Sequence, residues 1–319
     1  MKYLLSLILF SAIFTFLFYW TAGSLHNKKT YISPLPDFLT LDKNKQATFL
    51  DLWLPFIAKA SGNDSQLNEL TAKSILVYDL TSNKVIFEKD ANTHRPMASL
   101  TKIMTAIIAL ENKRDDDVYS VTTSDLVGED SMGLVAGEHL SLEELLYGLL
   151  LPSGNDAAET LATNYPSGGR EAFIKAMNDK AKALGLTDTH FSNPSGLQGD
   201  GEQHTTAYDL LVITRYALEN YPIFRKIVST PEYQIDETST HNAHYLTNET
   251  NLLTTYPGVK GVKTGYTPEA GLCLVTYLGY DGHKIIGIIL NSENRRGEMK
   301  ELLDSSLKNL GIEPPAYSG

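Results

Sequence analysis

The stretch Arg95-Pro-Met-Ala-Ser-Leu-Thr-Lys-Ile-Met-Thr105 places a serine, Ser99, three residues before a lysine, Lys102. Its apolar residues recur at helical spacing and predict a helix that begins at Ser99. Residues i and i+3 share one face of a helix, so the lysine amine can reach the serine hydroxyl. The unpaired N–H groups of a helix start also favour negative charge on the serine oxygen. Taken alone, the pair favours a plain helix cap, because the same spacing recurs at 305–308.

Two further short motifs follow along the chain. Ser153-Gly-Asn155 lies between two predicted helices, where a tight loop can direct a hydroxyl and a carboxamide into one cleft. Taken alone, Asn155 also fits a helix cap. Lys263-Thr-Gly265 is predicted to lie on a strand that presents Lys263 and Gly265 on one side, and a glycine there lets a ligand backbone approach closely. The alternative is an edge strand with a solvated lysine.

Strand patterns lie at both ends of the region that follows residue 73, and helix patterns lie between them. Asp281-Gly282 is a hairpin signal between the last two strands. Capping-box patterns begin helices at Ser141 and Thr206, and Gly185 ends another. The predicted strands are 74–79, 84–88, 272–280 and 284–290, and the predicted helices are 99–112, 142–151, 156–164, 171–184, 206–220 and 297–310. This order predicts an α+β domain whose sheet combines distant parts of the chain.

Composition narrows the class of protein. The chain has 319 residues, of which 42% are apolar and 20% charged, values of an ordinary globular protein with a real core. The net charge of −11 argues against a nucleic-acid partner. A single cysteine, Cys273, excludes an internal disulfide and a Cys-based metal centre. His241 and His244 have no third ligand pattern beside them, so they are expected to belong to a loop or the surface, and no metal or other cofactor is expected.

The N-terminus predicts export. Lys2 is followed by an uncharged run from Tyr3 to Ala22, which as a helix spans the roughly 30 Å core of a bilayer. Residues 1–24 are therefore predicted to be a signal or anchor segment. The small residues at 22–24 are compatible with cleavage, while the length of the run favours a retained anchor. Residues 25–70, interrupted by prolines, are predicted to be a stalk.

The three motifs occur in the order given for β-lactamases and penicillin-binding proteins: Ser-x-x-Lys, Ser-x-Asn and Lys-Thr-Gly. Together with the stretches 191–197, 205–210 and 263–271, they make residues 70–310 resemble the low-molecular-mass penicillin-binding proteins, the serine D-alanyl-D-alanine carboxypeptidases. The resemblance implies a β-lactamase/transpeptidase-like fold, with a mainly antiparallel sheet sandwiched by helices beside a helical subdomain. On this resemblance, the catalytic domain is expected to comprise residues 71–319, with no C-terminal β domain. The N-terminal segment is then expected to anchor the chain.

The resemblance also implies the catalytic roles. Ser99 would attack the carbonyl of the penultimate D-alanine, and Lys102 would be its general base. Ser153 would relay a proton to the leaving amine. Asn155 would bind the substrate amide and position Lys102. The charge of Lys263 nearby would help to lower the pKa of Lys102.

The remaining motif residues would bind substrate. The ammonium group of Lys263 and the hydroxyl of Thr264, beside Gly265, would face the terminal carboxylate of the D-Ala-D-Ala unit. Backbone N–H groups of Ser99 and Tyr266 would form the oxyanion hole. Arg295 or Arg296, which the spacing does not separate, would assist at the carboxylate.

The implied partners of the site are peptidoglycan stem peptides and, as covalent inhibitors, β-lactams. The implied location is the outer face of the bacterial cytoplasmic membrane, to which the N-terminal segment would bind, or the periplasm. Three other functions use the same fold. A D,D-endopeptidase that cuts cross-links has the same catalytic set, so the motifs do not separate it from a carboxypeptidase. A class A β-lactamase needs a Glu-x-x-Leu-Asn pattern, which does not occur between Asn155 and Lys263. An inactive peptidoglycan-binding module would have lost Ser99 or Lys102.

Overall fold

The computed structural model describes residues 69–166, 168–197 and 201–317. The predicted signal or anchor segment, and nearly all of the predicted stalk, lie outside the described residues and stay predictions. Within the described ranges no helix combines the length and the apolar character needed to cross a membrane.

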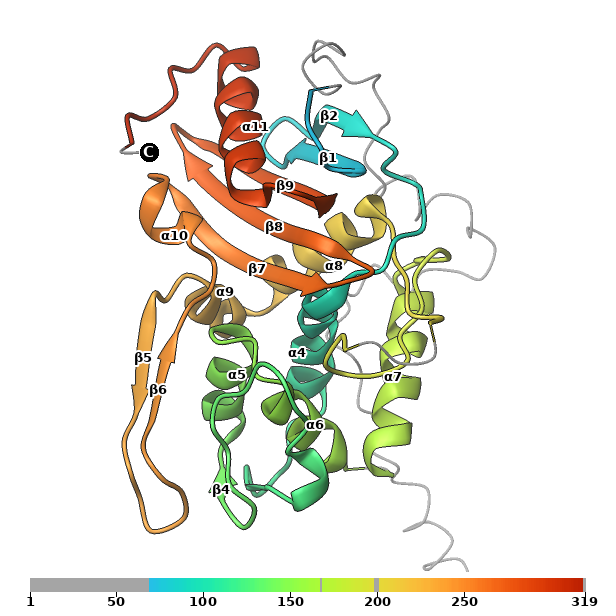
Figure 1. Ribbon diagram of the computed structural model, residues 1–319, viewed down its shortest axis with the longest axis vertical. Coiled ribbons are helices and arrows are strands. Elements are labelled where there is room, and N and C mark those ends of the chain that lie inside the picture. Colours follow the sequence, from blue (N-terminus) through green and yellow to red (C-terminus); the bar gives the residue numbers. More distant parts are fainter. Residues whose placement is uncertain (1–68, 167, 198–200, 318–319) are drawn as a thin grey trace, which may run out of the picture. The chain divides into compact units, whose positions relative to one another are not determined.

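A five-stranded antiparallel sheet forms the upper part of the molecule in Figure 1. Its strands are β1 (Ser74–Asp79), β2 (Lys84–Lys89), β7 (Val259–Thr267), β8 (Gly271–Tyr280) and β9 (His283–Ser292). Their order across the sheet is β2-β1-β9-β8-β7, so the first two strands pair with the end of the chain. The turn between β8 and β9 has positive φ at both Asp281 and Gly282, as the predicted hairpin requires. The predicted sheet from distant parts of the chain is therefore confirmed.

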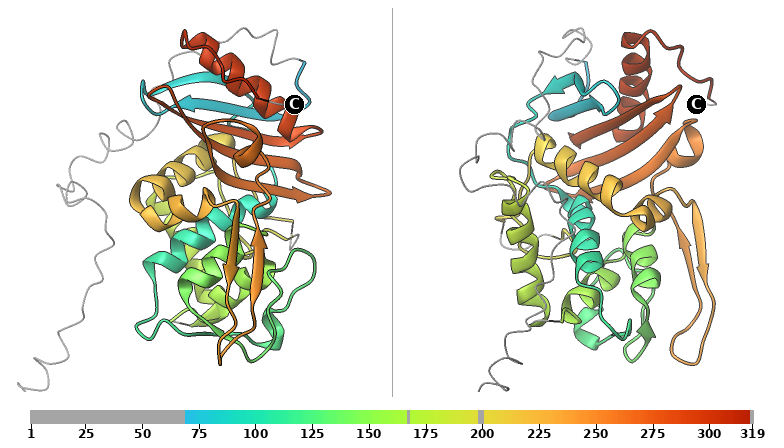
Figure 2. Two further views of the ribbon diagram at one scale, coloured as in Figure 1. Left: turned by 90° about the vertical axis from the view of Figure 1, so that its left-hand side faces the viewer. Right: turned by 180° about the vertical axis from the view of Figure 1, so that it is seen from behind.

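Helices cover both faces of this sheet (Figure 2). α11 (Arg295–Asn309) packs on one face, and α8 (Ala207–Asn220) packs on the other. The core between the sheet and α11 is apolar. Its fully buried members include Ile285, Ile289 and Leu303.

The helical part lies below the sheet in Figure 1. It contains the 3₁₀ turn η2 (Ala98–Thr101) and the helices α4 (Lys102–Glu111), α5 (Leu142–Leu150), α6 (Asn155–Thr163) and α7 (Gly169–Ala183). The predicted capping box at the start of α5 is confirmed, because Ser141 Oγ accepts from Glu144 N and Glu144 Oε2 accepts from Ser141 N. Thr206 likewise caps α8 by accepting from Asp209 N at 3.1 Å.

Several short elements were not predicted. They are β3 (Tyr119–Ser120), η3 (Thr123–Asp125), β4 (His139–Leu140), α9 (Pro222–Val228), β5 (Glu232–Ile235), β6 (His244–Thr247) and α10 (Leu252–Thr255). β5 and β6 form a hairpin that stands beside α5 in Figure 1, and the segment from β6 to α10 leads into β7.

Candidate active site

Ser99 lies in a tight turn and not at the start of an α-helix. The prediction of one helix from Ser99 was wrong in this detail, because residues 98–101 form η2 and the α-helix begins at Lys102. Ala98 has φ +49°, and Thr101 Oγ1 donates to its carbonyl oxygen at 2.8 Å, which fixes the turn. A non-glycine residue in this backbone region is strained, and such strain is common at functional sites.

Two glycines let other segments approach the backbone of Ser99. A Cβ on Gly196, which has φ +86°, would lie 2.1 Å from Ala98 O and 2.9 Å from Ser99 N. A Cβ on Gly265, in β7, would lie 3.2 Å from the same nitrogen. Glycine at both positions therefore lets the 191–197 loop and β7, the strand that carries Lys263-Thr264-Gly265 (the K-T-G strand), lie against the turn that holds Ser99.

Lys102 is fully buried directly below Ser99. Its Nζ lies 2.9 Å from Ser99 Oγ, 2.7 Å from Asn155 Oδ1 and 2.6 Å from the backbone carbonyl oxygen of Ser195. Burial, helped by the positive charge of Lys263, holds the pKa of Lys102 well below its usual value. The sequence-based expectation of a depressed lysine pKa agrees with this, with burial as the larger cause.

The neutral form of Lys102 fits these three neighbours. An uncharged amine has two N–H donors and one lone pair. Asn155 Oδ1 and the Ser195 carbonyl can only accept hydrogen bonds, so they take the two donors. The lone pair then faces Ser99 Oγ, which can donate its proton. The site therefore holds Lys102 in the orientation that a general base for Ser99 needs.

The loop 191–197 supplies the Ser195 carbonyl. Asn193 Oδ1 accepts from the backbone N–H groups of Ser195 at 3.2 Å and Gly196 at 2.7 Å. Thr105 Oγ1, on α4, donates to the carbonyl oxygen of Pro194 at 2.6 Å. Sequence reasoning noted this stretch only as part of a resemblance and missed its role, because a backbone carbonyl leaves no signature in the residue type.

Ser153 lies in the loop between α5 and α6, and Asn155, at the start of α6, contacts Lys102. Ser153 has φ +65°, and its Oγ is buried without a hydrogen-bond partner among the described residues. Asn155 is the first residue of α6 rather than its cap, and Gly154 is the cap residue. The alternative of a capping asparagine is therefore wrong, because its side-chain oxygen accepts from Lys102 instead.

β7 borders the site as the edge strand of the sheet. Lys263 is buried, donates from Nζ to Thr264 O at 3.1 Å, and burial lowers its pKa to about 8. The alternative of a solvated edge lysine is therefore wrong. Thr264 is also buried, while the Tyr266 side chain is 61% exposed.

The structure separates the two candidate arginines. Arg295 Nη1 donates to the carbonyl oxygen of Gly265 at 2.8 Å, and its charge acts on Lys263. Arg296 is exposed and lines a neighbouring cavity of about 270 Å³ together with Glu249. The geometry favours Arg295 as the residue beside the K-T-G strand.

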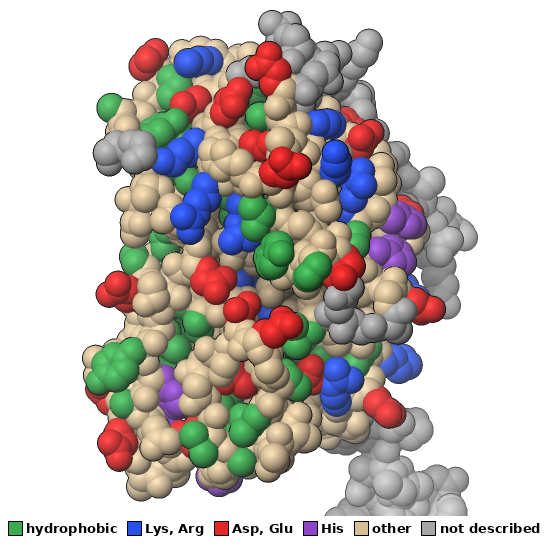
Figure 3. Space-filling view, in the orientation of Figure 1, with side chains coloured by type: hydrophobic (Ala, Val, Ile, Leu, Met, Phe, Trp, Pro, Cys, Tyr) green, Lys and Arg blue, Asp and Glu red, His purple; other side chains and the backbone are tan. Residues whose placement is uncertain are grey.

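Two acidic residues of the site were not predicted. Buried Asp156 accepts from the backbone N–H groups of Met132 at 3.0 Å and Leu134 at 3.0 Å, which fixes the loop before α5. Glu249 Oε2 accepts from Thr264 Oγ1 at 3.0 Å. Figure 3 shows acidic side chains gathered around a hollow in the middle of this face, below basic side chains over the sheet.

Other polar features lie apart from the motif residues. His241 lies in the loop between β5 and β6, as expected, and His244 begins β6. Both are buried, beside the carboxylates of Glu144 and Glu138 at 3.5 Å each, so the surface alternative was wrong. No group of three metal-ligating side chains occurs among the described residues.

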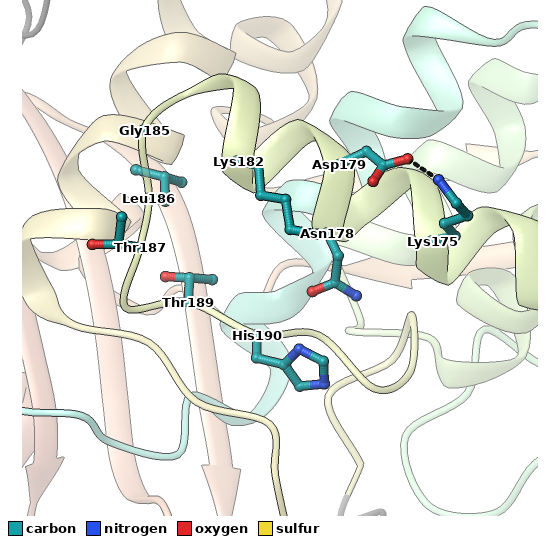
Figure 4. Close-up of a pocket in the computed structure, with 9 residues that line it drawn as sticks. All are labelled: Lys175, Asn178, Asp179, Lys182, Gly185, Leu186, Thr187, Thr189 and His190. Atoms are coloured by element: carbon teal, nitrogen blue, oxygen red, sulfur yellow. Dashed lines mark hydrogen bonds and ion pairs between the residues drawn. The ribbon is translucent and has the colours of Figure 1, made fainter.

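A pocket of about 640 Å³ lies beside α7, where Figure 4 shows Lys175 paired with Asp179. No motif residue lines this pocket.

Comparison with known proteins gives the family. A family model described as D-alanyl-D-alanine carboxypeptidase matches residues 59–294. The chain belongs to the D-alanyl-D-alanine carboxypeptidase family. The D-alanyl-D-alanine carboxypeptidase DacF of Bacillus subtilis is 33% identical over 266 residues, which cover 81% of this chain and 67% of that protein. A D-alanyl-D-alanine endopeptidase of Pseudomonas aeruginosa is 36% identical over 212 residues, 65% of this chain and 67% of the relative.

The same fold occurs in a solved family structure. The crystal structure of the Streptomyces K15 DD-transpeptidase superposes with a TM-score of 0.70 at 32% identity, covering 75% of this chain and 98% of the other. The expected family and its transpeptidase-like α+β fold are therefore confirmed. The expected enzyme class, a serine-type D-Ala-D-Ala carboxypeptidase, is confirmed with them.

Proposed function

We propose that this D-alanyl-D-alanine carboxypeptidase removes the terminal D-alanine from peptidoglycan pentapeptide stems through an acyl-enzyme on Ser99. The observation that carries the proposal is the buried Lys102, whose Nζ lies 2.9 Å from Ser99 Oγ and whose pKa is depressed by burial. A serine hydroxyl is a weak nucleophile until such a base takes its proton.

In the acylation step, Ser99 Oγ forms an ester bond with the carbonyl carbon of the penultimate D-alanine. Its proton passes to Lys102. The scissile C–N bond breaks, and the proton reaches the leaving amine through Ser153, whose free Oγ supports this relay. Backbone N–H groups of Ser99 and Tyr266 stabilise the negative charge on the carbonyl oxygen.

The K-T-G strand binds the end of the substrate. The Lys263 ammonium group, the Thr264 hydroxyl and the Arg295 guanidinium group face the terminal carboxylate, and Gly265 leaves room for the peptide backbone. Release of D-alanine then opens space for a water molecule. Lys102 takes a proton from this water, and the ester is hydrolysed to free Ser99.

The second candidate function is D,D-endopeptidase cleavage of cross-links, because one relative carries that name. Incubation with a pentapeptide stem and with a cross-linked muropeptide, followed by mass spectrometry, separates the two. Loss of one D-alanine from the pentapeptide supports the carboxypeptidase. Cleavage of the cross-linked compound into two stem peptides, with the pentapeptide left intact, would support the endopeptidase. Ser99→Ala is the control that must stop either reaction.

The proposed location follows from this substrate and from the N-terminal run. The stem peptides lie outside the cytoplasmic membrane, and residues 3–22 are apolar enough to anchor the chain there. β-Lactams, which carry a carboxylate beside a strained amide, are the proposed covalent inhibitors.

A further inference from the structure

Glu249 connects two of the motifs that form the site. It lies between β6 and α10, outside every motif that the sequence analysis singled out. Its backbone N–H donates to the carbonyl oxygen of Leu151 at 3.1 Å, just before the Ser153 loop. Its side-chain Oε2 accepts from Thr264 Oγ1 at 3.0 Å, on the K-T-G strand. The backbone is thus fixed at one motif while the carboxylate reaches the other.

The carboxylate of Glu249 lies in the electrostatic field of the whole site. Its negative charge acts on Lys102, on Lys263 and on Arg295. The side chain is exposed and lines the cavity that it shares with Arg296. A carboxylate of the protein itself therefore occupies a hydrogen bond that the proposed function assigns to the substrate carboxylate.

We propose that Glu249 is a specificity-determining residue that competes with the terminal carboxylate of the ligand for the Thr264 hydroxyl. This inference rests on the proposed function, which supplies a ligand with a free carboxylate. Thr264 has one O–H, so it donates to only one acceptor at a time. Binding of the ligand turns this donor away from Glu249 and leaves two carboxylates side by side, which costs binding free energy.

The competition acts on one end of the ligand only. A ligand that ends in a carboxamide carries no charge beside Glu249 and meets no repulsion. Glu249 also raises the pKa of Lys102, but that effect is common to both ligands. The ratio of kcat/KM for the acid to kcat/KM for the amide therefore cancels any change in Lys102. Glu249 also raises the pKa of Lys263, and loss of that effect would lower the ratio, so a rise in the ratio reports relief of the repulsion.

The test compares the parent protein with Glu249→Gln, which keeps the size of the side chain and removes its charge. The substrates are an N-acylated D-Ala-D-Ala dipeptide with a free carboxylate and the same peptide with a terminal carboxamide. The assay is run at low ionic strength and about pH 6.5, so that Lys263, with a pKa of about 8, is charged. We expect the acid-to-amide ratio to rise about tenfold in Glu249→Gln.

The matched control is Glu232→Gln, because Glu232 on β5 is an exposed glutamate that lines the same cavity. Its ratio should equal that of the parent. In a Thr264→Val background, Glu249→Gln should no longer raise the ratio, since the shared donor is gone. An unchanged or lower ratio in Glu249→Gln would overturn the proposal. So would the same rise with and without the Thr264 hydroxyl.

A second ligand pair separates failure of this inference from failure of the proposed function. A penicillin and its methyl ester differ in the same carboxylate, and their reaction is followed as acylation of Ser99 without any peptide hydrolysis. If the parent hydrolyses neither peptide, the proposed function fails, and the penicillin pair still measures the ratio. A rise in the acid-to-ester ratio in Glu249→Gln supports the competition, and no rise contradicts it.

Discussion

Lys102 shows how one residue can be made into a base by its surroundings. A lysine amine with no access to water loses the solvation that stabilises its charge, so its proton affinity falls. Its neighbours then decide its orientation, because Asn155 Oδ1 and the Ser195 carbonyl hold its two donors away from Ser99. The sequence spacing predicted the reach from Lys102 to Ser99. It could not predict the Ser195 carbonyl, which depends on how a distant loop folds.

Lys102→Ala removes the base and leaves the rest of the site in place. We expect acylation by penicillin to fall by about 10²–10⁴-fold, the usual contribution of a general base. In the parent, the acylation rate rises with pH as Lys102 loses its proton, and this limb should disappear in the variant. Stopped-flow or gel-based acylation across a pH series measures both effects. Acylation of Lys102→Ala at the parent rate would contradict the assignment.

The pKa of Lys263 predicts that activity falls at high pH. Its pKa of about 8 means that the ammonium group is present below that pH and is lost above it. The attraction for the substrate carboxylate therefore fades as the pH rises through about 8, and kcat/KM should fall there. Lys263→Arg keeps its charge at all these pH values, so any activity it retains should lack this limb. An identical high-pH limb in Lys263→Arg would show that another group titrates.

At the scale of elements, the caps and hairpin turns were predictable and the connections were not. Ser141 with Glu144 and Asp281 with Gly282 are local signals, because neighbours in the chain satisfy them. The strands of the hairpin, β5 and β6, have only four residues each. The alternation of polar and apolar residues in Glu232–Ile235 is therefore too short to stand out as a strand signal. The turn at Ser99 packs against Gly196 and Gly265, which come from other parts of the chain, so its surroundings have no local signal.

Asp156 fixes the loop at residues 131–134, which has no helix or strand of its own. Its carboxylate accepts from Ser131 Oγ at 2.5 Å and from the backbone N–H groups of Met132 and Leu134 at 3.0 Å each. Asp156→Ala leaves the buried N–H groups of Met132 and Leu134 unpaired, at a cost of about 3 kcal/mol in the free energy of unfolding. The melting temperature should fall by roughly 6–12 °C in thermal unfolding.

The control for this prediction is Asp116→Ala. Asp116 forms an exposed ion pair with Arg114 at 2.9 Å, and such pairs contribute little to stability. Its melting temperature should stay that of the parent. Equal losses in the two variants would mean that the contacts of Asp156 do not stabilise the loop.

At the scale of the whole molecule, the site exists only because distant segments meet. The sheet joins 74–89 to 259–292, and the side chains of the proposed site come from η2, α4, the loop before α6, the start of α6 and β7. The described domain also includes residues ahead of β1, because Leu70 is buried in the core and Thr71 Oγ1 donates to Glu298 at 2.7 Å. The predicted domain division at residue 71 stays a prediction.

The N-terminal segment should act as a tether that the domain does not need. The full chain is expected to fractionate with membranes through residues 3–22, and a chain starting at Leu25 should be soluble with unchanged kcat/KM. This start keeps Leu70 and Thr71 in place. N-terminal sequencing of the native protein checks the anchor. A mature protein that begins at Leu25 would contradict retention of the anchor.

Penicillin tests most directly whether Ser99 is the nucleophile of a D-Ala-D-Ala peptidase. Ser99 should open the strained amide, while Lys263 and Thr264 hold the drug carboxylate. The leaving nitrogen stays attached to the drug and blocks the approach of water from that side. The sequence lacks the Glu-x-x-Leu-Asn pattern that would activate water from the other side, and loss of a general base costs about 10²–10⁴-fold in rate.

The decisive measurement is peptide mapping by mass spectrometry of the protein after incubation with penicillin. The predicted result is a penicilloyl adduct on the peptide that contains Ser99, which persists for minutes or longer and is absent from Ser99→Ala. Rapid steady-state hydrolysis of penicillin, with no adduct trapped on Ser99, would contradict the account and indicate a β-lactamase.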